Sequence, residues 1–283
     1  MLLYHYTDQN GFMGIIQNHE LWATKIQYLN DSSEFSLACD LAENQLQKSL
    51  LIQKDSKVKF RINRFISNLK CISNLNLCVC SLSEEGDLLS QWRGYSRQQG
   101  GYCIGFEKDE LGKLLSSQRY TLKQCIYDEK EQNRLIMNVI NSSLERYLDY
   151  EEPNINEVDM SSDSSEYFTM ELATIAPLIK SNSFSEEKEW RIMSNGGINF
   201  DRLSFRAGTS MLIPFHKILL RKDFWNLIRL VTVGHTPHSQ LAHSSTRAFL
   251  YQQLSAALEK MPHKDLTADI PRVINSQIPY RSW

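Results

Sequence analysis

Two short segments, far apart in the chain, carry the residues most able to act on a substrate. Glu187, Glu189 and Arg191 lie in SEEKEWRIM, and the segment LCVCSLS ends with Ser81 and Ser83. If EWRIMS forms a strand, Glu189 and Arg191 share one face of it. A carboxylate beside an arginine stays ionised at neutral pH, so Glu189 could polarise a hydroxyl or stabilise a developing cation. Solvated strand charges are the common alternative explanation for this pattern.

A short helix is expected over 87–95, directly after Ser83, and it carries Trp92 and Tyr95. A hydroxyl at the end of a strand can hydrogen-bond a ribose or a phosphate, and an aromatic ring can stack on a planar ring. The competing interpretation is that both aromatic residues anchor the core and that Ser83 only caps the helix.

The segment LYHYT opens the chain as a strand in which Tyr4 and Tyr6 share one face and His5 points to the other. A buried histidine with satisfied hydrogen bonds is the default interpretation of His5. An imidazole that binds substrate is the alternative.

Other common kinds of catalytic or metal site have little support. The chain contains no Gly-x-Ser-x-Gly elbow, phosphate-binding Walker loop or Gly-x-Gly-x-x-Gly fingerprint. Cys78 and Cys80 would share a strand face, but no second cluster completes a tetrahedral set of ligands. His235, His238 and His243 have a spacing that gives weak evidence for a metal. We therefore expect no metal site.

The composition is that of a soluble globular protein, with 42% hydrophobic and 23% charged residues in 283. The net charge of −2 indicates no global basic field for nucleic acid, although a local basic groove stays open. The sequence has no apolar stretch of the ~18 residues that a membrane span needs and no signal-peptide pattern. We expect a cytoplasmic protein with reduced thiols and no membrane partner.

Short strands alternate with helices of uneven length, so we expect an α+β (mixed α/β) fold. The prediction is a single domain over residues 1–283, with a short-stranded central sheet split by helices. It includes a helical insertion at about 32–73. The acidic, serine-rich stretch at about 151–166 is expected to be an exposed loop.

The ordered segments YHYT, LWAT, YLNDSSEF, SLSEEGDLLSQWRGY, GGYCIGF, EKEWRI and FRAG resemble a large, uncharacterised bacterial domain-of-unknown-function family. Members of that family open with a YHYT-type strand and carry SQW-x-x-Y and EWR motifs. The resemblance covers about residues 1–235. Some members are associated with bacterial immunity or mobile elements.

The same order is similar, more distantly, to the ADP-ribosyltransferase superfamily, especially its His-Tyr-Glu branch and the related RNA 2′-phosphotransferases. Those folds begin with a strand carrying histidine and a helix of the GIIQNHEL kind. A strand ending near Ser-x-Ser, a helix bearing an aromatic residue and a late strand with the catalytic glutamate follow. Tyr6 departs from this pattern, because the superfamily usually has glycine there.

The resemblance implies NAD as a co-substrate. Glu189 would hold the ribose 2′-hydroxyl and stabilise an oxocarbenium-like transition state as nicotinamide leaves. Glu187 would help to activate the acceptor. His5, with Thr7 nearby, would bind the nicotinamide ribose, and Tyr95 would stack on nicotinamide.

The remaining residues implied to bind the co-substrate come from the same motifs. Trp92 is the less favoured stacking residue, and Ser81 and Ser83 would contact ribose or phosphate. Arg191 and Arg206 would contact the pyrophosphate, because a guanidinium fork matches phosphate oxygens.

The leading hypothesis is an NAD-dependent mono-ADP-ribosyltransferase-like or NAD-cleaving effector, in a toxin or anti-phage system, with an unknown macromolecular acceptor. A first alternative is a non-enzymatic sensor that recognises a protein partner through an aromatic groove around Trp22, Trp92 and Tyr95. A second alternative is a metal-dependent nuclease that uses Asp31, Glu34 and Glu189.

Overall fold

The computed structural model describes residues 1–29, 33–96, 100–148, 157–220, 224–259 and 270–279. Of residues 33–35, 147–148 and 157–164 it describes the backbone only. Within these ranges the chain forms a mixed sheet covered by helices, so the expected α+β class is confirmed.

Ten strands of the described residues form one sheet, in the order β10-β9-β4-β1-β3-β2-β8-β7, with β6 bridging β3 and β5. The strands are β1 (Leu2–Asp8), β2 (Glu20–Lys25), β3 (Cys78–Ser83), β4 (Gly101–Glu107), β5 (Tyr120–Gln124), β6 (Glu189–Ser194), β7 (Ser204–Ala207), β8 (Leu212–Leu219), β9 (Ile228–Val233) and β10 (Arg272–Asn275).

The sheet divides at β3. Ser83 is paired with Glu189 of β6 and with Tyr4 of β1, while Val79 is paired with β6 and with Thr24 of β2. Because a strand has only two edges, β1 and β2 must share the edge of β3 that faces away from β6. The sheet therefore has two parts that meet at this edge of β3. One part consists of β1, β4, β9 and β10, and the other consists of β2, β8 and β7.

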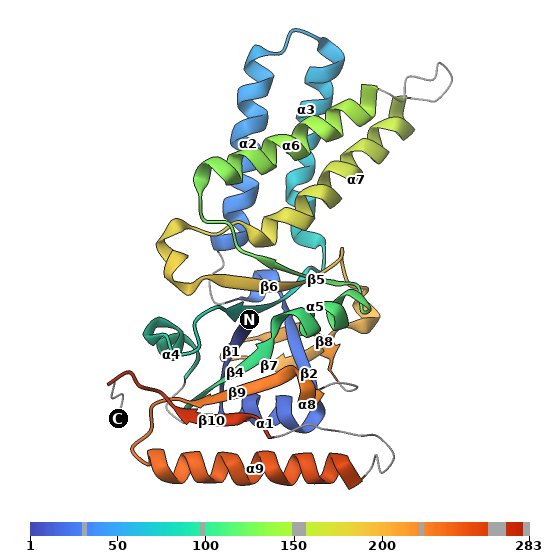
Figure 1. Ribbon diagram of the computed structural model, residues 1–283. Coiled ribbons are helices and arrows are strands. Elements are labelled where there is room, and N and C mark those ends of the chain that lie inside the picture. The colour runs from blue at the N-terminus through green and yellow to red at the C-terminus, as the bar shows by residue number, and fades with distance from the viewer. Residues whose placement is uncertain (30–32, 97–99, 149–156, 221–223, 260–269, 280–283) are drawn as a thin grey trace.

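One core lies against the β1 half of the sheet. It contains Leu3, Ile104, Phe106 and Val231 and is covered by helices at the lower end in Figure 1. These helices are α1 (Gln9–Asn18), which Asp8 caps by accepting a hydrogen bond from Gly11 N, and α9 (Ser239–Glu259). Short helices α4 (Leu89–Tyr95), α5 (Lys108–Ser116) and α8 (Phe224–Leu227) fill the connections.

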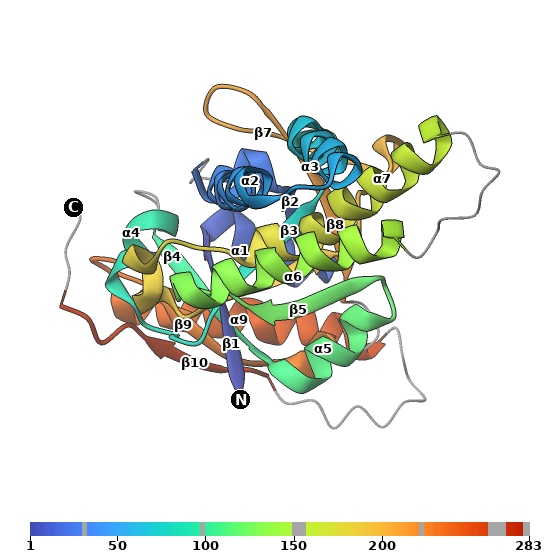
Figure 2. The ribbon, with the colours of Figure 1, turned by 90° about the horizontal axis from the view of Figure 1, so that it is seen from above.

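The other core belongs to a helical arm that rises from the sheet (Figure 1). The arm consists of α2 (Ser33–Ile52), α3 (Ser56–Asn68), α6 (Glu129–Leu148) and α7 (Glu157–Ile175). Seen from above, α2 and α3 are nearly end-on, with α6 and α7 beside them (Figure 2). Phe65 and Phe168 stack at 4.5 Å between ring centroids. Because Val79 and Met193 join this core, the arm packs directly on the sheet.

The helices predicted over 32–73 are α2, α3 and the 3-10 helix η2 (Leu69–Asn74). The predicted exposed loop over 151–166 is wrong from residue 157 onward, where α7 begins. Residues 151–156 lie outside the described ranges. Buried Phe168 and Leu172 anchor α7 in the arm core, and such tertiary packing stabilises a helix that local composition does not predict.

Candidate functional site

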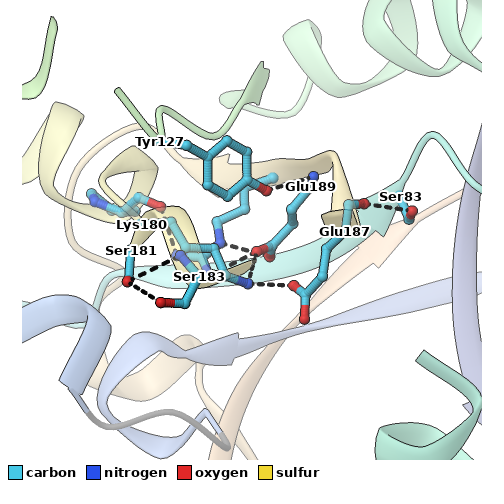
Figure 3. Close-up of polar contacts among 9 residues, drawn as sticks. Ser83, Tyr127, Lys180, Ser181, Ser183, Glu187 and Glu189 are labelled. Carbon is cyan, nitrogen blue, oxygen red and sulfur yellow. Dashed lines mark hydrogen bonds and ion pairs between the residues drawn. The ribbon is translucent and has the colours of Figure 1, made fainter. Parts of the chain in front are cut away.

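Lys180, Glu187, Glu189 and Arg191 form a charged network at the start of β6, in which every side chain except that of Glu187 is buried. Figure 3 labels the first three of these residues. Lys180 Nζ lies 2.5 Å from Glu187 Oε2 and 2.5 Å from Glu189 Oε2. Arg191 donates from Nε to Glu189 Oε1 at 2.8 Å, from Nη2 to Glu189 Oε2 at 3.2 Å and from Nη1 to Pro177 O at 2.7 Å. Two cations and two carboxylates make the network neutral overall, which suits its burial.

The connection before β6 brings Lys180 and Glu187 to Glu189. Lys180 N donates to Ile126 O, and this bond fixes the residue beside the end of β5. The 3-10 helix η4 (Asn182–Glu187) follows, and Lys188, with φ 42°, turns the chain into β6. Glu189 N donates to the hydroxyl of Tyr127 at 2.9 Å.

The charge of Glu189 is stabilised by its partners. Burial by itself would raise the pKa of Glu189, but the charges and hydrogen bonds of Arg191 and Lys180 lower this pKa to about 2. Glu189 is therefore an ionised carboxylate at neutral pH. Its side chain is 6% exposed, compared with 18% for Glu187, so Glu187 is the more accessible of the two carboxylates.

Ser83 lies directly opposite Glu189 and is 2% exposed. Its hydroxyl donates to Glu187 O at 2.7 Å and accepts from Glu85 N at 3.0 Å. Because paired residues project from the same side of a sheet, Tyr4, Ser83 and Glu189 form one row on one face. Ser83 therefore fixes the backbone on which Glu187 is carried.

His5 lies on β1, next to Tyr4, the residue that pairs with Ser83 of β3. Its Nδ1 donates to Ser81 O at 3.0 Å, so Nε2 is the acceptor of the neutral ring. Burial lowers the pKa of His5, although the Ser81 hydrogen bond opposes this change, and the ring is neutral at pH 7. Since His5 follows Tyr4, it projects from the face opposite to Glu189. Thr7, two residues on, is partly exposed and shares the face of His5.

The two aromatic residues of α4 have different environments. Trp92 is 1% exposed, its Nε1 donates to Asp87 Oδ1 at 2.7 Å, and Tyr6 packs edge-on against its ring at 4.9 Å. This burial agrees with the interpretation of Trp92 as a core anchor, whereas stacking on a ligand would need an accessible ring. Tyr95 is 37% exposed. Partial burial and the charges of Glu189 and Glu187 raise the pKa of Tyr95 to about 12.

The two arginines implied to bind pyrophosphate also differ. Arg191 is 1% exposed and holds Glu189 and Pro177, so it acts as a support for the carboxylate. Arg206 is exposed on β7 and donates to Thr24 Oγ1 at 3.3 Å. Ser81 is partly exposed, and its carbonyl is the partner of His5.

The structure thus collects Ser83, Tyr95, Glu187, Glu189 and Arg191 at one place, and it sets His5 and Thr7 on the other face. Sequence reasoning missed Lys180 and Tyr127, which contact Glu189. Lys180 lies in the irregular segment before β6, and Tyr127 lies between β5 and α6, so neither residue belongs to a spacing pattern within β6.

The structure gives little support to a metal site or to the nuclease site. The described residues contain no group of three or more His, Cys, Asp or Glu side chains placed to hold a metal. Asp31 and the side chain of Glu34 lie outside the described residues. His235 and His243 donate to the backbone oxygens of Ile278 and Val273.

The proposed aromatic groove is not assembled as expected, because Trp92 is buried. Trp22 stacks on Phe215 of β8 at 4.3 Å and donates to Glu20 Oε1. It therefore lies on the β2 half of the sheet, whereas Tyr95 lies within electrostatic range of Glu189 and Glu187. No helix in the described ranges is both long and apolar enough to cross a membrane.

Residues 91–192 match the model of a family described as "Protein of unknown function (DUF2971)". The matched region runs from α4 to β6 and includes Tyr95 and the whole ion network. It supports the uncharacterised domain-of-unknown-function family inferred from the motifs. Comparisons with curated proteins and with solved structures gave no match.

Proposed function

We propose that this protein is an NAD-dependent ADP-ribosyltransferase-like or NAD-cleaving enzyme. The observation that carries this proposal is the adjacency of β1, β3 and β6, which come from three distant parts of the chain. These strands bear His5, the Ser81 and Ser83 pair, and Glu189, the elements that the superfamily likeness names. Their meeting at β3 supports one site on the face that carries Ser81, Ser83 and Glu189, while His5 projects from the opposite face of β1.

In the proposed reaction, the bond between the ribose carbon and the nicotinamide nitrogen breaks, and its electrons leave with nicotinamide. An acceptor or water then bonds to the ribose carbon and loses a proton. Glu189 supplies a fixed negative charge for the developing cation, an effect that is largest where charges are preorganised. Glu187, the more accessible carboxylate, contacts the ribose or the acceptor.

Lys180 constrains this scheme, because it already binds one oxygen of each carboxylate. A ribose hydroxyl that donates to Glu189 Oε2 must displace the ammonium group from that oxygen. Tyr95 has an accessible ring within electrostatic reach of both glutamates, so it is our candidate for stacking on nicotinamide. His5, whose Nδ1 is bonded to Ser81 O on the opposite face, has no direct contact with the substrate in this scheme.

The test measures nicotinamide release and transfer of labelled ADP-ribose from NAD to protein and nucleic-acid acceptors. We expect release by the wild type and at least tenfold slower release by Glu187→Gln and Tyr95→Ala. Tyr251→Ala changes a 65% exposed tyrosine on α9 and serves as the matched control. A wild type that neither binds NAD by calorimetry nor releases nicotinamide with any acceptor would refute the proposal.

We further propose a role as a toxin or anti-phage effector with a macromolecular acceptor, which rests on the family likeness alone. Expression of the wild type should arrest bacterial growth, and expression of Glu187→Gln to the same level should not. Equal growth of both strains, with active wild-type protein, would remove this role while leaving the enzymatic proposal intact.

A further inference from the structure

The end of the helical arm exposes three large apolar side chains. Leu51 is 85% exposed, Ile52 is 82% exposed and Phe60 is 57% exposed. Ile52 ends α2, and α3 begins at Ser56, so all three lie within about 6 Å of a helix end, measured along the helix axis. Single exposed apolar residues are ordinary, but a group of them marks an interaction site.

Lysines flank the apolar residues in the sequence. We name residues 48–60 the arm tip; this segment contains four lysines and one aspartate, a formal charge of +3 in a chain whose net charge is −2. Asp55 caps α3 by accepting from Lys57 N and Val58 N. The exposed lysines of the arm tip are Lys48, Lys54, Lys57 and Lys59.

We propose that the arm tip binds the surface of an anionic membrane. Leu51, Ile52 and Phe60 enter the boundary between headgroups and acyl chains, and the lysines contact lipid phosphates. Apolar side chains bordered by lysines are the pattern that gives interfacial binding to anionic lipids. The contact is peripheral, involves no membrane-spanning segment, and does not depend on the proposed enzymatic function.

Shape and chemistry favour a membrane over a macromolecular partner. The arm tip is the convex end of a helical hairpin, at the end of the arm away from the sheet (Figure 1). A convex apolar tip inserts into a fluid headgroup layer, whereas a protein partner would need a matching pocket. A nucleic acid would be bound by the lysines alone, and its affinity would not depend on Leu51 or Ile52.

The test uses the full chain and sedimentation with vesicles of phosphatidylcholine, with or without phosphatidylglycerol. We expect binding only to the anionic vesicles, at least tenfold weaker for the double variant Leu51→Ser, Ile52→Ser. Loss of one lysine, as in Lys57→Gln, should weaken binding about fivefold, because each basic residue contributes ~1 kcal/mol near such a surface. Leu241→Ser, which changes a 71% exposed leucine of α9, should bind like the wild type.

A Phe60→Trp variant reports insertion directly, since brominated acyl chains quench a tryptophan that reaches the membrane. Absence of binding to anionic vesicles would refute the proposal, as would equal binding by the Leu51, Ile52 variant. If only the lysine variants lose binding and an oligonucleotide competes with vesicles, the arm tip is a nucleic-acid site and the proposal is wrong. Self-association that the leucine change abolishes, without vesicle binding, would identify a second copy as the occupant instead.

Discussion

Replacing Glu189 by Gln removes the central charge of the buried network and tests its contribution to stability. The carboxylate accepts from Arg191 Nε and Nη2 and from Lys180 Nζ. An amide has a single acceptor oxygen, and its NH2 group would face these cations. Breaking a buried charge network by removal of one member costs about 3–5 kcal/mol. Because Glu187 still pairs with Lys180, we expect a loss near the lower limit, about 3 kcal/mol at pH 7.

The pH dependence of stability tests the same contribution of the Glu189 charge. The pKa of Glu189 is about 2 in the folded protein, compared with an ordinary glutamate value of 4.5. A depressed folded pKa contributes stability that is fully present above pH 4.5 and is lost as pH falls toward 2. The difference between these pKa values corresponds to a contribution on the order of 3 kcal/mol at neutral pH. The stability difference between wild type and variant should therefore narrow progressively below pH 4.5.

Urea-induced unfolding, followed by tryptophan fluorescence at several values between pH 7 and pH 3, measures this difference. Glu131→Gln is the matched control, because Glu131 forms an exposed i,i+3 ion pair with Arg134. That control should stay close to the wild type. A Glu189→Gln difference below about 1 kcal/mol at pH 7, or one that does not change with pH, would refute the reasoning. The result also decides whether lost activity in this variant reflects chemistry or unfolding.

Two further predictions follow from buried polar groups. Lys180→Met leaves the network with one excess negative charge, so the pKa values of Glu187 and Glu189 should rise. The acid limb of the pH profile of nicotinamide release should therefore shift to higher pH. An unchanged acid limb would show that Lys180 does not control these groups. Tyr6→Phe removes a hydroxyl that donates to Glu85 O and accepts from Leu88 N, and it should cost about 1–3 kcal/mol in urea unfolding. A loss within measurement error would show that water replaces the hydroxyl.

Several strands could be predicted because they are short segments rich in apolar and aromatic residues. EWRIMS and GYCIGFE form strands over the expected residues, and Glu189 and Arg191 share a face as alternation predicts. Alternation could not tell whether that face was solvated. It is buried, because the arm and the segment before β6 cover it.

The partners of Glu189 could not be predicted in the same way. Lys180 reaches the carboxylate through an irregular segment whose course depends on η4 and on the left-handed conformation of Lys188. Neither feature has a periodic signal in sequence. The default interpretation of His5, a histidine with a satisfied ring nitrogen, matches its bond to Ser81. The position of its strand beside both β3 and β4 needed the sheet topology.

The division of the sheet at β3 also has a consequence for biosynthesis. Tyr4 leaves the ribosome first, but its neighbour Ser83 comes much later, and Glu189, the third member of their row, later still. Pairings between such distant residues form slowly, since loop closure must precede them. A nascent chain can fold the α2–α3 hairpin from local contacts, yet it cannot assemble the ion network until β6 has been synthesised. Any activity that depends on this network therefore appears only after β6 (Glu189–Ser194) has been synthesised.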